Sequence, residues 1–501
     1  MGRCLVHSCQ PTALVSLGKD WVARGQELMA FGETARVLTD AGVPLARPPA
    51  YAATGGSEDD AVLELLHPRI QGALLGRWGD SAHRERLELQ GLRRIDVLVM
   101  DLPESIDFDA PNPEDLAAAL LLRAAAWNHR WVLPVCDLDD LGEVLNRWDE
   151  GAGFDLPFSE RMAAKALMMV GRLDSSLTPG WQRGLDEGAP ESWVVQTRRS
   201  DEVEMRGKGG WRFGLYAAKT EQSQELVQHS GPPVTPRVLM DADLAVGCLS
   251  GMESPAILLA HHGGLCGFER VTEDMGMGDG FSHARRSDPR GAFGSVVGLN
   301  REVDSALAKA LAAAFIEAVV APAFSAEARA ELGRTRIRLL QTPMDEVAPS
   351  TMACRSTRWG MMLGWSGGGC DPEVELLSRR PAEPDELEAL ALAWRLVRQL
   401  PGLALVASEP NRLVAAAWAQ TSLREAIVAV KPRLVAAVGR KAVACDSSFR
   451  FAEDVDILAN CGVSALLHLG GAPRQSEIIE RVDELGMVMQ VIDELSLGGK
   501  V

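Results

Sequence analysis

The sequence predicts an α/β protein with at least two domains, and three observations support this prediction. Short apolar runs of strand length alternate with longer stretches of helical spacing along most of the chain. Runs such as Ile95 to Met100 are apolar almost throughout, which is typical of parallel strands buried on both faces. A single hydrophobic core stops growing at about 250–300 residues. A chain of 501 residues with 47% hydrophobic content therefore needs more than one core.

The elements of the first part alternate in type between Ala13 and about Leu145. Strands are expected at ALVSL, at ELMAF before Gly32, at IDVLVMDL and at WVLPVC. Helices are expected at TARVLTDAG and at LAAALLLRAAAWNH. Apolar residues at helical spacing then predict one long helix over Leu156 to Leu185. Together these elements indicate parallel βαβ units.

The second part begins after a polar, glycine-rich segment at residues 186–210, which predicts a linker. From Trp211 strands and helices alternate again toward the C-terminus. The most apolar region, Ala306 to Phe324, contains Lys309 and Glu317 and is broken by a proline. We therefore expect a buried helix and strand there, and no membrane span.

The charge balance narrows the class of partner. Acidic residues outnumber basic ones by 69 to 51, which gives a formal net charge of -18. Such a surface repels a phosphate-coated polymer, so we expect no nucleic-acid partner. A small anionic nucleotide remains compatible, because local arginines and backbone N–H groups bind phosphate whatever the global charge.

The nine cysteines are scattered and include no Cys-x-x-Cys pair, which is typical of a reducing cytoplasm. Cys4, His7 and Cys9 lie close together, but no second ligand pair follows them. We interpret this segment as a frayed N-terminus, and we expect no metal site. Polar residues follow Met1 too soon for a signal peptide, so a soluble, cytoplasmic protein is expected.

Two neighbouring stretches carry a resemblance to a known family. ILLAHHGGLCGFE, from Ile257, contains a His-His pair before a glycine-rich turn, and the stretch from Ser287 contains Asp-Pro followed by Ala-Phe-Gly. They resemble the formyltransferase half of the bifunctional purine-biosynthesis enzymes, AICAR transformylase/IMP cyclohydrolase. In that family a Lys-His pair opens a short turn, and an Asp-Pro-x-x-Ala-Phe-Gly loop follows. LLHPRIQGALLGR and RAAAWNH extend the resemblance to the first half, so that it covers nearly the whole chain.

The resemblance implies a particular domain order. Residues 1–185 would form a methylglyoxal-synthase-like, doubly wound domain with a connecting helix, and residues 186–210 a linker. Two cytidine-deaminase-like subdomains would follow in tandem at 211–375 and 376–501. The family transfers a formyl group from 10-formyl-tetrahydrofolate to AICAR and then closes the product, FAICAR, to IMP. The resemblance also implies a homodimer, because the family's formyltransferase site is shared between two subunits.

For formyl transfer the resemblance places His262 at the family's catalytic histidine and His261 at the neighbouring lysine. Histidine suits proton removal from a weakly nucleophilic amine because its ordinary pKa lies near 6.5. The alternative interpretation is that the backbone of the glycine-rich turn satisfies both histidines. The resemblance further implies five substrate-binding positions, which are Arg212, Asp288, Arg355, Gln420 and Asp446.

The ring-closing half departs from the family pattern. The family's phosphate loop, Ser-Thr-Gly-Gly-Thr, reads Ala-Phe-Gly-Glu-Thr here, so Glu33 brings a carboxylate to a loop that should face a dianion. Glu64, Pro103 and Trp127 stand where the family has two lysines and a tyrosine. We therefore expect this half to lack cyclohydrolase activity.

Three hypotheses about function follow. The first is a divergent enzyme that works through His262. The second is a catalytically silent paralogue that binds a nucleotide or acts as a regulatory or scaffold protein. The third, a zinc nucleobase deaminase, is excluded because it needs a His-x-Glu string together with a Pro-Cys-x-x-Cys string, and Pro-Cys-x-x-Cys does not occur.

Overall fold

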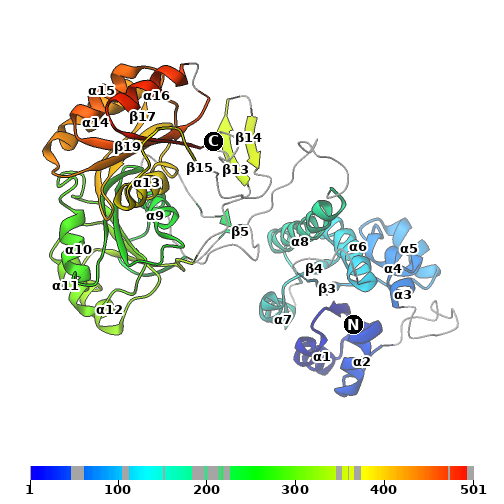
Figure 1. The fold of residues 1–501 in the computed structure, drawn as a ribbon. Helices are drawn as coiled ribbons and strands as arrows, with labels where there is room; N and C mark the ends of the chain where they lie inside the picture. Colours follow the sequence, from blue (N-terminus) through cyan, green and yellow to red (C-terminus); the bar gives the residue numbers. More distant parts are fainter. Residues whose placement is uncertain are drawn as a thin grey trace. The chain divides into compact units, whose positions relative to one another are not determined.

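The computed structural model describes most of the chain, in two compact units, Met1–Gln196 and Thr197–Val501 (Figure 1). The described residues are 2–46, 61–103, 112–149, 153–182, 198–199, 214, 216–217, 226–345, 352–358, 360–365, 374–471 and 474–492. Parallel strands and intervening helices occur in both units. The α/β class is therefore confirmed.

The described strands of the first unit form a four-stranded parallel sheet in the order β2-β1-β3-β4. Its strands are β1 (Arg3–Ser8), β2 (Glu27–Ala30), β3 (Val97–Asp101) and β4 (Leu133–Val135). Its helices are α1 (Leu14–Ala23), α2 (Gly32–Asp40), α3 (Ala61–Leu65), α4 (Pro68–Leu75), α5 (Ser81–Leu89), α6 (Pro113–Trp127), α7 (Leu141–Asp149) and α8 (Leu156–Gln182).

Helices cover both faces of this sheet. Side chains alternate along β1, so that Leu5 packs with α4, α6 and α8, while Cys4 and Val6 pack with α1, α2 and α7. A parallel sheet buried on both faces explains why β3 is a continuous apolar run. The long helix expected from Leu156 is confirmed as α8.

Two N-terminal predictions are wrong. The expected strand at ALVSL is the beginning of helix α1, and the expected frayed end is β1, which lies between β2 and β3 with all six residues buried. The polar residues of β1 are satisfied by distant partners. Arg3 Nε lies 2.7 Å from Glu27, and His7 Nε2 lies 3.1 Å from Asp115. These contacts offset the cost of burying the polar side chains of β1.

In the second unit, the described strands include two six-stranded sheets. The first is built from β7 (Val227–Ser230), α9 (Pro236–Leu249), β8 (Ala256–His261), β9 (Gly264–Arg270), α10 (Met277–Ala284), β10 (Val296–Leu299), α11 (Ser305–Ala312), β11 (Ala318–Ala321), α12 (Ala326–Leu332) and β12 (Arg338–Gln341). The helix and strand expected over residues 306–324 are confirmed as α11 and β11.

The second sheet is built from β15 (Val374–Leu376), α13 (Pro384–Val397), β16 (Leu403–Ser408), β17 (Leu413–Gln420), α14 (Leu423–Ala436), β18 (Lys441–Cys445), α15 (Ala452–Asn460), β19 (Val463–Leu469), α16 (Gln475–Glu484) and β20 (Val488–Ile492). Two short hairpin-like pairs lie outside these sheets. They are β5 (Arg198–Arg199) with β6 (Tyr216–Ala217), and β13 (Met352–Thr357) with β14 (Gly360–Trp365).

The two six-stranded sheets repeat one topology. Their strand orders are β7-β12-β11-β10-β8-β9 and β15-β20-β19-β18-β16-β17, and corresponding pairs are parallel or antiparallel in the same way. The elements also follow in the same order along the chain. We call residues 227–341 the first repeat and residues 374–492 the second repeat.

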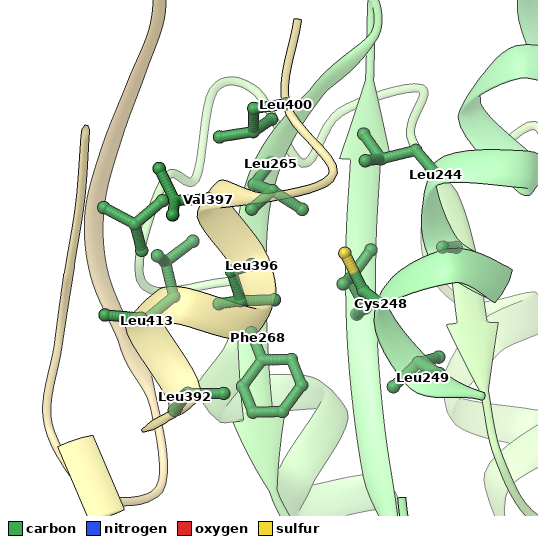
Figure 2. Close-up of a cluster of buried hydrophobic side chains, with 14 of the residues drawn as sticks. Leu244, Cys248, Leu249, Leu265, Phe268, Leu392, Leu396, Val397, Leu400 and Leu413 are labelled. Carbon is green, nitrogen blue, oxygen red and sulfur yellow. The ribbon is translucent and has the colours of Figure 1, made fainter. Parts of the chain in front are cut away.

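The two repeats share one core and one strand junction. Helices α9 and α13 contribute to a common buried cluster, in which Phe268 of β9 lies beside Leu392 and Leu396 of α13 (Figure 2). Glu269 forms an antiparallel bridge with Arg412 at the start of β17. The repeats therefore run edge to edge in opposite directions. In the part of the chain that the structure describes, no helix is long and apolar enough to cross a membrane.

A buried carboxyl group lies at this junction. Glu269 is 5% exposed, and its Oε1 lies 3.8 Å from Nδ1 of His283. Burial raises the pKa of Glu269 to about 7, with Glu409 adding to the rise and Arg412 opposing it. The folded protein therefore keeps a proton that the unfolded chain loses near pH 4.5.

We expect Glu269→Gln to change the pH dependence of stability. Because the folded-state pKa lies above the unfolded one, the parent should lose stability as pH rises from about 4.5 to about 7. The variant, which cannot ionise there, should be more stable than the parent above about pH 7, by about 2–3 kcal/mol. Urea unfolding across this range measures the difference. Equal pH profiles for parent and variant would contradict the prediction.

Candidate functional site

The predicted catalytic pair lies at the tip of the β8–β9 hairpin. His261 ends β8, and His262 with Gly263 forms the turn into β9. His262 has a φ of 56°, a conformation that disfavours most residues with a Cβ. The carboxylate of Asp241, on α9, accepts hydrogen bonds from the N–H groups of His262 (3.3 Å) and Gly263 (2.7 Å). A buried carboxylate therefore holds the turn in its strained form.

The charge of Asp241 is balanced by a chain of ion pairs. Asp241 is fully buried, and its Oδ2 lies 3.2 Å from Arg237. Arg237 also lies 2.5 Å from Glu317, which lies 3.7 Å from Arg338. A buried charge is tolerated when it is paired and hydrogen-bonded, as Asp241 is. This network keeps the backbone of His262 in place.

The two histidine rings stack on each other, with centroids 3.9 Å apart and planes inclined by 19°. Nδ1 of His261 lies 2.9 Å from the carbonyl oxygen of Gly291. A carbonyl oxygen can only accept, so Nδ1 carries the proton of this bond. The Nε2 atom of a neutral His261 is then an acceptor. Neutral His261 consequently cannot donate a hydrogen bond through Nε2.

Two exposed aromatic rings adjoin the hairpin. Phe293 and Phe315 are 62% and 63% exposed and stack with centroids 4.2 Å apart. The N–H of Gly294 donates to the carbonyl oxygen of Phe315, and a Cβ on Gly294 would lie 3.8 Å from the His261 ring. Stacked, exposed aromatic rings offer an apolar surface to a planar ligand. Sequence reasoning did not assign Phe315, although it lies within the apolar segment described above.

Asp288 joins the two repeats. Its Oδ1 accepts a hydrogen bond from the N–H of Gly291 (3.1 Å), and its Oδ2 lies 2.6 Å from Arg433 of α14. Burial raises the pKa of Asp288, but the Gly291 N–H and Arg433 outweigh this and hold the pKa below its usual value. The carboxylate is thus ionised and engaged by the protein, beside the same Gly291 that contacts His261.

Gln420 and Asp446 lie at one edge of the second sheet. Gln420 ends β17, pairs with Leu403 and donates from Nε2 to the carbonyl oxygen of Trp418 (2.9 Å). Asp446 follows β18 and accepts from the N–H of Ala404, next to Leu403, at 2.7 Å. Both side chains therefore have partners within the second repeat.

Trp418, near the end of β17, contacts the histidine hairpin. A Cβ on Gly264, the first residue of β9, would lie 1.9 Å from the Trp418 ring, so the ring packs directly on the Gly264 backbone. The structure thus gathers His261, His262, Asp288 and the end of β17 in one region. Trp418 occupies space beside the hairpin that a smaller residue would leave open.

Two predicted anion ligands are not placed relative to this region. Arg212 lies outside the described residues. Arg355 is on β13, where it pairs with Met362 of β14, and its side chain lies outside the described part of the structure. Their proposed roles rest on the sequence.

In the first unit, carboxylates lie at the start of α2, the segment in which the sequence analysis expected the phosphate loop. Glu33 pairs with Arg36 at the surface, at 3.1 Å. A Cβ on Gly32 would lie 2.5 Å from Oε1 of Glu114, so the Glu114 carboxylate abuts the first residue of the helix. His7, bound to Asp115, has its Nδ1 3.9 Å from Glu114. A helix N-terminus normally attracts an anion, and here the Glu114 carboxylate takes the place of a bound anion.

Within the described ranges, no group of three His, Cys, Asp or Glu residues is arranged to hold a metal ion. The fold and the hairpin together define an α/β protein with a histidine pair held between two repeats. The family model of the AICARFT/IMPCHase bienzyme matches residues 125–431. The chain belongs to this family, as its sequence motifs predicted.

Several curated relatives match nearly end to end. "Bifunctional purine biosynthesis protein PurH" of Myxococcus xanthus (strain DK1622) is 28% identical over 95% of this chain and 96% of that protein. The protein of the same name from Shouchella clausii (strain KSM-K16) is 28% identical over 97% of this chain and 98% of that protein. The one from Bacillus subtilis (strain 168) is 27% identical over 97% of this chain and 97% of that protein. Among solved structures, "Crystal structure of ForH" is 23% identical and covers 35% of this chain and 96% of its own, with a TM-score of 0.31.

Proposed function

We propose that this chain is a divergent member of the family whose remaining chemistry lies in the second unit. There it would transfer a formyl group from 10-formyl-tetrahydrofolate to the amino group of AICAR or a similar purine ribonucleotide. The observation that carries the proposal is the backbone of His262, which has φ 56° and is held by the buried Asp241. We assign His262 to the family's catalytic position by the sequence match. Preorganised groups of this kind lower a reaction barrier without reorganisation.

In the proposed reaction the amino nitrogen attacks the formyl carbon, and His262 accepts the proton that the nitrogen releases. The tetrahedral intermediate then collapses, which breaks the bond between the formyl carbon and the folate nitrogen, and tetrahydrofolate leaves after this nitrogen takes up a proton. The oxyanion that forms on the formyl oxygen needs a hydrogen-bond donor. His261 serves poorly while neutral, because its Nδ1 proton is directed to Gly291. It can donate through Nε2 only as an imidazolium, whereas the family's lysine carries a permanent charge.

We assign the other roles by the family match. Arg212 and Arg355 are proposed phosphate ligands, and Asp288, Gln420 and Asp446 are proposed to shape the nucleotide site. We also propose the finer fold assignment, with a methylglyoxal-synthase-like first domain (1–185), a linker (186–210) and two cytidine-deaminase-like subdomains (211–375 and 376–501). The parallel sheet of the first unit and the repeated topology of the second support it. We propose that the protein acts in the cytoplasm, uses no metal cofactor and has no nucleic-acid partner.

The test is formation of FAICAR from AICAR and 10-formyl-tetrahydrofolate, run beside a calorimetric titration with AICAR. Turnover supports the enzyme. AICAR binding without turnover supports the second candidate, a catalytically silent paralogue with a nucleotide-binding or regulatory role. The packing of Trp418 on Gly264, next to the histidine pair, favours this second candidate. If the protein shows no turnover and does not bind AICAR, the enzymatic proposal is wrong.

We expect the first unit to show no cyclohydrolase activity. The Glu114 carboxylate abuts the start of α2, where the substrate phosphate would have to bind, and like charges repel. Purified protein should therefore convert FAICAR to IMP no faster than the uncatalysed reaction. Conversion above that rate, measured by the appearance of IMP, would refute this expectation.

We also propose a homodimer, since the family's formyltransferase site is completed by a second subunit. Obligate interfaces usually bury more than about 2,000 Å² and persist at low concentration. Light scattering at micromolar concentration should give twice the mass of the 53.9 kDa chain. A monomeric mass would count against the proposal.

A further inference from the structure

The indole of Trp418 lies face-on against the backbone of the histidine hairpin. A Cβ on Gly264 would lie 1.9 Å from Cζ2 of the indole and 2.3 Å from each of the ring atoms bonded to it, Cε2 and Cη2. The Cβ position is therefore above the plane of the ring, because a Cβ beyond the ring edge would be markedly farther from these two neighbours than from Cζ2. The indole thus fills the space that any side chain at position 264 would need.

Gly264 is required here by space and not by its backbone conformation. Its φ lies outside the left-handed region, so other residues could adopt it. Gly264 pairs with His261 across the two-residue turn of the hairpin. Residues directly opposite each other in an antiparallel pair have Cβ positions about 4.5–5.5 Å apart. A ring at the Cβ position of Gly264 therefore lies beside the histidine pair.

Trp418 is part of a β-bulge. Leu403 pairs with Gln420, and Leu405 pairs with Ala417, so that two steps along β16 correspond to three along β17. Strand β17 therefore has one extra residue at this point. Bulges commonly re-aim a side chain next to a functional site, and this one lies where β17 contacts the histidine hairpin.

Strained backbone flanks the contact on both sides. Among the described residues, the positive φ values outside glycine are those of His262 (56°) and Ala419 (53°). His262 lies two residues before Gly264, and Ala419 directly follows Trp418. Such conformations persist where the surrounding contacts hold them. Trp418 is half-buried and packs against the core that both repeats share, so its ring is held in one place.

The indole stands between two groups of the proposed nucleotide site. At one end it contacts Gly264, close to His262, and at the other end the carbonyl oxygen of Trp418 accepts a hydrogen bond from Nε2 of Gln420 (2.9 Å). In the proposed function the amino group of the acceptor lies at His262, and Gln420 shapes the nucleotide site. The heterocycle of AICAR can meet His262 without passing the indole, whereas a ribose phosphate that extends toward Gln420 has to pass it.

We propose that Trp418 is a specificity-determining residue, which weakens binding of the ribonucleotide relative to the free heterocycle. This inference rests on the proposed function, because it takes the acceptor amine to lie at His262. The acceptors that this site favours are then small heterocyclic amines, to whose affinity a ribose phosphate adds little. Removal of the indole restores the affinity that the ribose phosphate would otherwise add.

The test compares two ligands on the full chain, AICAR and its free base, which lacks the ribose phosphate. Both are titrated by calorimetry into the parent and into Trp418→Ala. We expect the variant to bind AICAR about tenfold more tightly than the parent or better, and the free base within about threefold of the parent. The ratio of the two affinities isolates the discrimination, because a general loss of structure would weaken both.

Trp131→Ala is the matched control. Trp131, in the first unit, is 38% exposed, and a Cβ on Gly79 would lie 2.5 Å from its ring, so it is also an indole packed on a glycine. This variant should bind both ligands as the parent does. Trp418→Phe keeps a smaller aromatic ring against the hairpin, and its affinity for AICAR should lie between those of the parent and Trp418→Ala. The melting temperature of each variant verifies that it is folded.

Three results would overturn the inference. If folded Trp418→Ala and Trp418→Phe bind AICAR no more tightly than the parent does, Trp418 does not discriminate, and the proposed function is unaffected. If both ligands gain equally, the indole obstructs the whole site and selects nothing. If neither ligand binds the parent or either Trp418 variant, the inference and the proposed nucleotide site are both wrong.

Discussion

Replacing His262 with asparagine is expected to lower formyl transfer by about 10²–10⁴-fold, the usual contribution of a general base. Asparagine tolerates the left-handed backbone better than other residues with a Cβ, so the variant removes the imidazole and leaves the turn in its observed form, with φ near 56°. FAICAR formation under saturating substrates measures the loss. The melting temperature should stay within a few degrees of the parent.

Two further variants test the assignment. His262→Ala should lose similar activity and also some stability, because alanine is strained at positive φ. His261→Lys should raise the rate, because lysine restores a donor that the Gly291 carbonyl does not occupy. Full activity in His262→Asn would show that proton removal is carried out by another group.

Replacing Asp241 with alanine is expected to destabilise the second unit by about 3–5 kcal/mol, the cost of breaking a buried ion pair by removing one partner. Asp241 is fully buried, and its loss leaves Arg237 and the N–H groups of His262 and Gly263 without their acceptor. The midpoint of guanidinium unfolding measures the effect. Formyl transfer should fall as well, because the turn that positions His262 is released.

Glu317→Gln is the matched control. Glu317 belongs to the same ion-pair chain, but its side chain is 33% exposed, so its loss should cost no more than about 1 kcal/mol. If Asp241→Ala were no more destabilising than Glu317→Gln, the buried carboxylate would not be what holds the hairpin.

Local sequence patterns were sufficient to predict much of the fold. The continuous apolar run before Asp101 predicted β3, and the apolar spacing after Leu156 predicted α8. Strand β1 was missed because its polar residues are stabilised by partners that are distant in the chain. Arg3 pairs with a residue 24 positions away and His7 with one 108 positions away, which no local pattern reveals.

The candidate site shows the same limit. The family motif identified His261 and His262, but the contribution of Asp241, 22 positions before Gly263, depends on how α9 packs against β8. The available signal was a pair of carboxylates, Asp241 and Asp243, in a mostly apolar helix. Glu114 was missed for a similar reason, since its contact with Gly32 joins elements far apart in sequence. Motifs identify reacting groups, whereas the groups that hold them are set by tertiary packing.

The repeated topology of the second unit has a consequence for how this chain has changed. The repeat gives one molecule two structurally corresponding sets of strands and helices, which meet where Glu269 of β9 forms an antiparallel bridge with Arg412. One copy carries the histidine pair and a carboxylate that closes the space behind it. The other has Ala389 at the corresponding place in α13, where it lines a cavity of about 460 Å³. Because Arg433 and Trp418 of the second copy contact the first, a substitution in one copy changes the surroundings of the other, so the two copies cannot change independently.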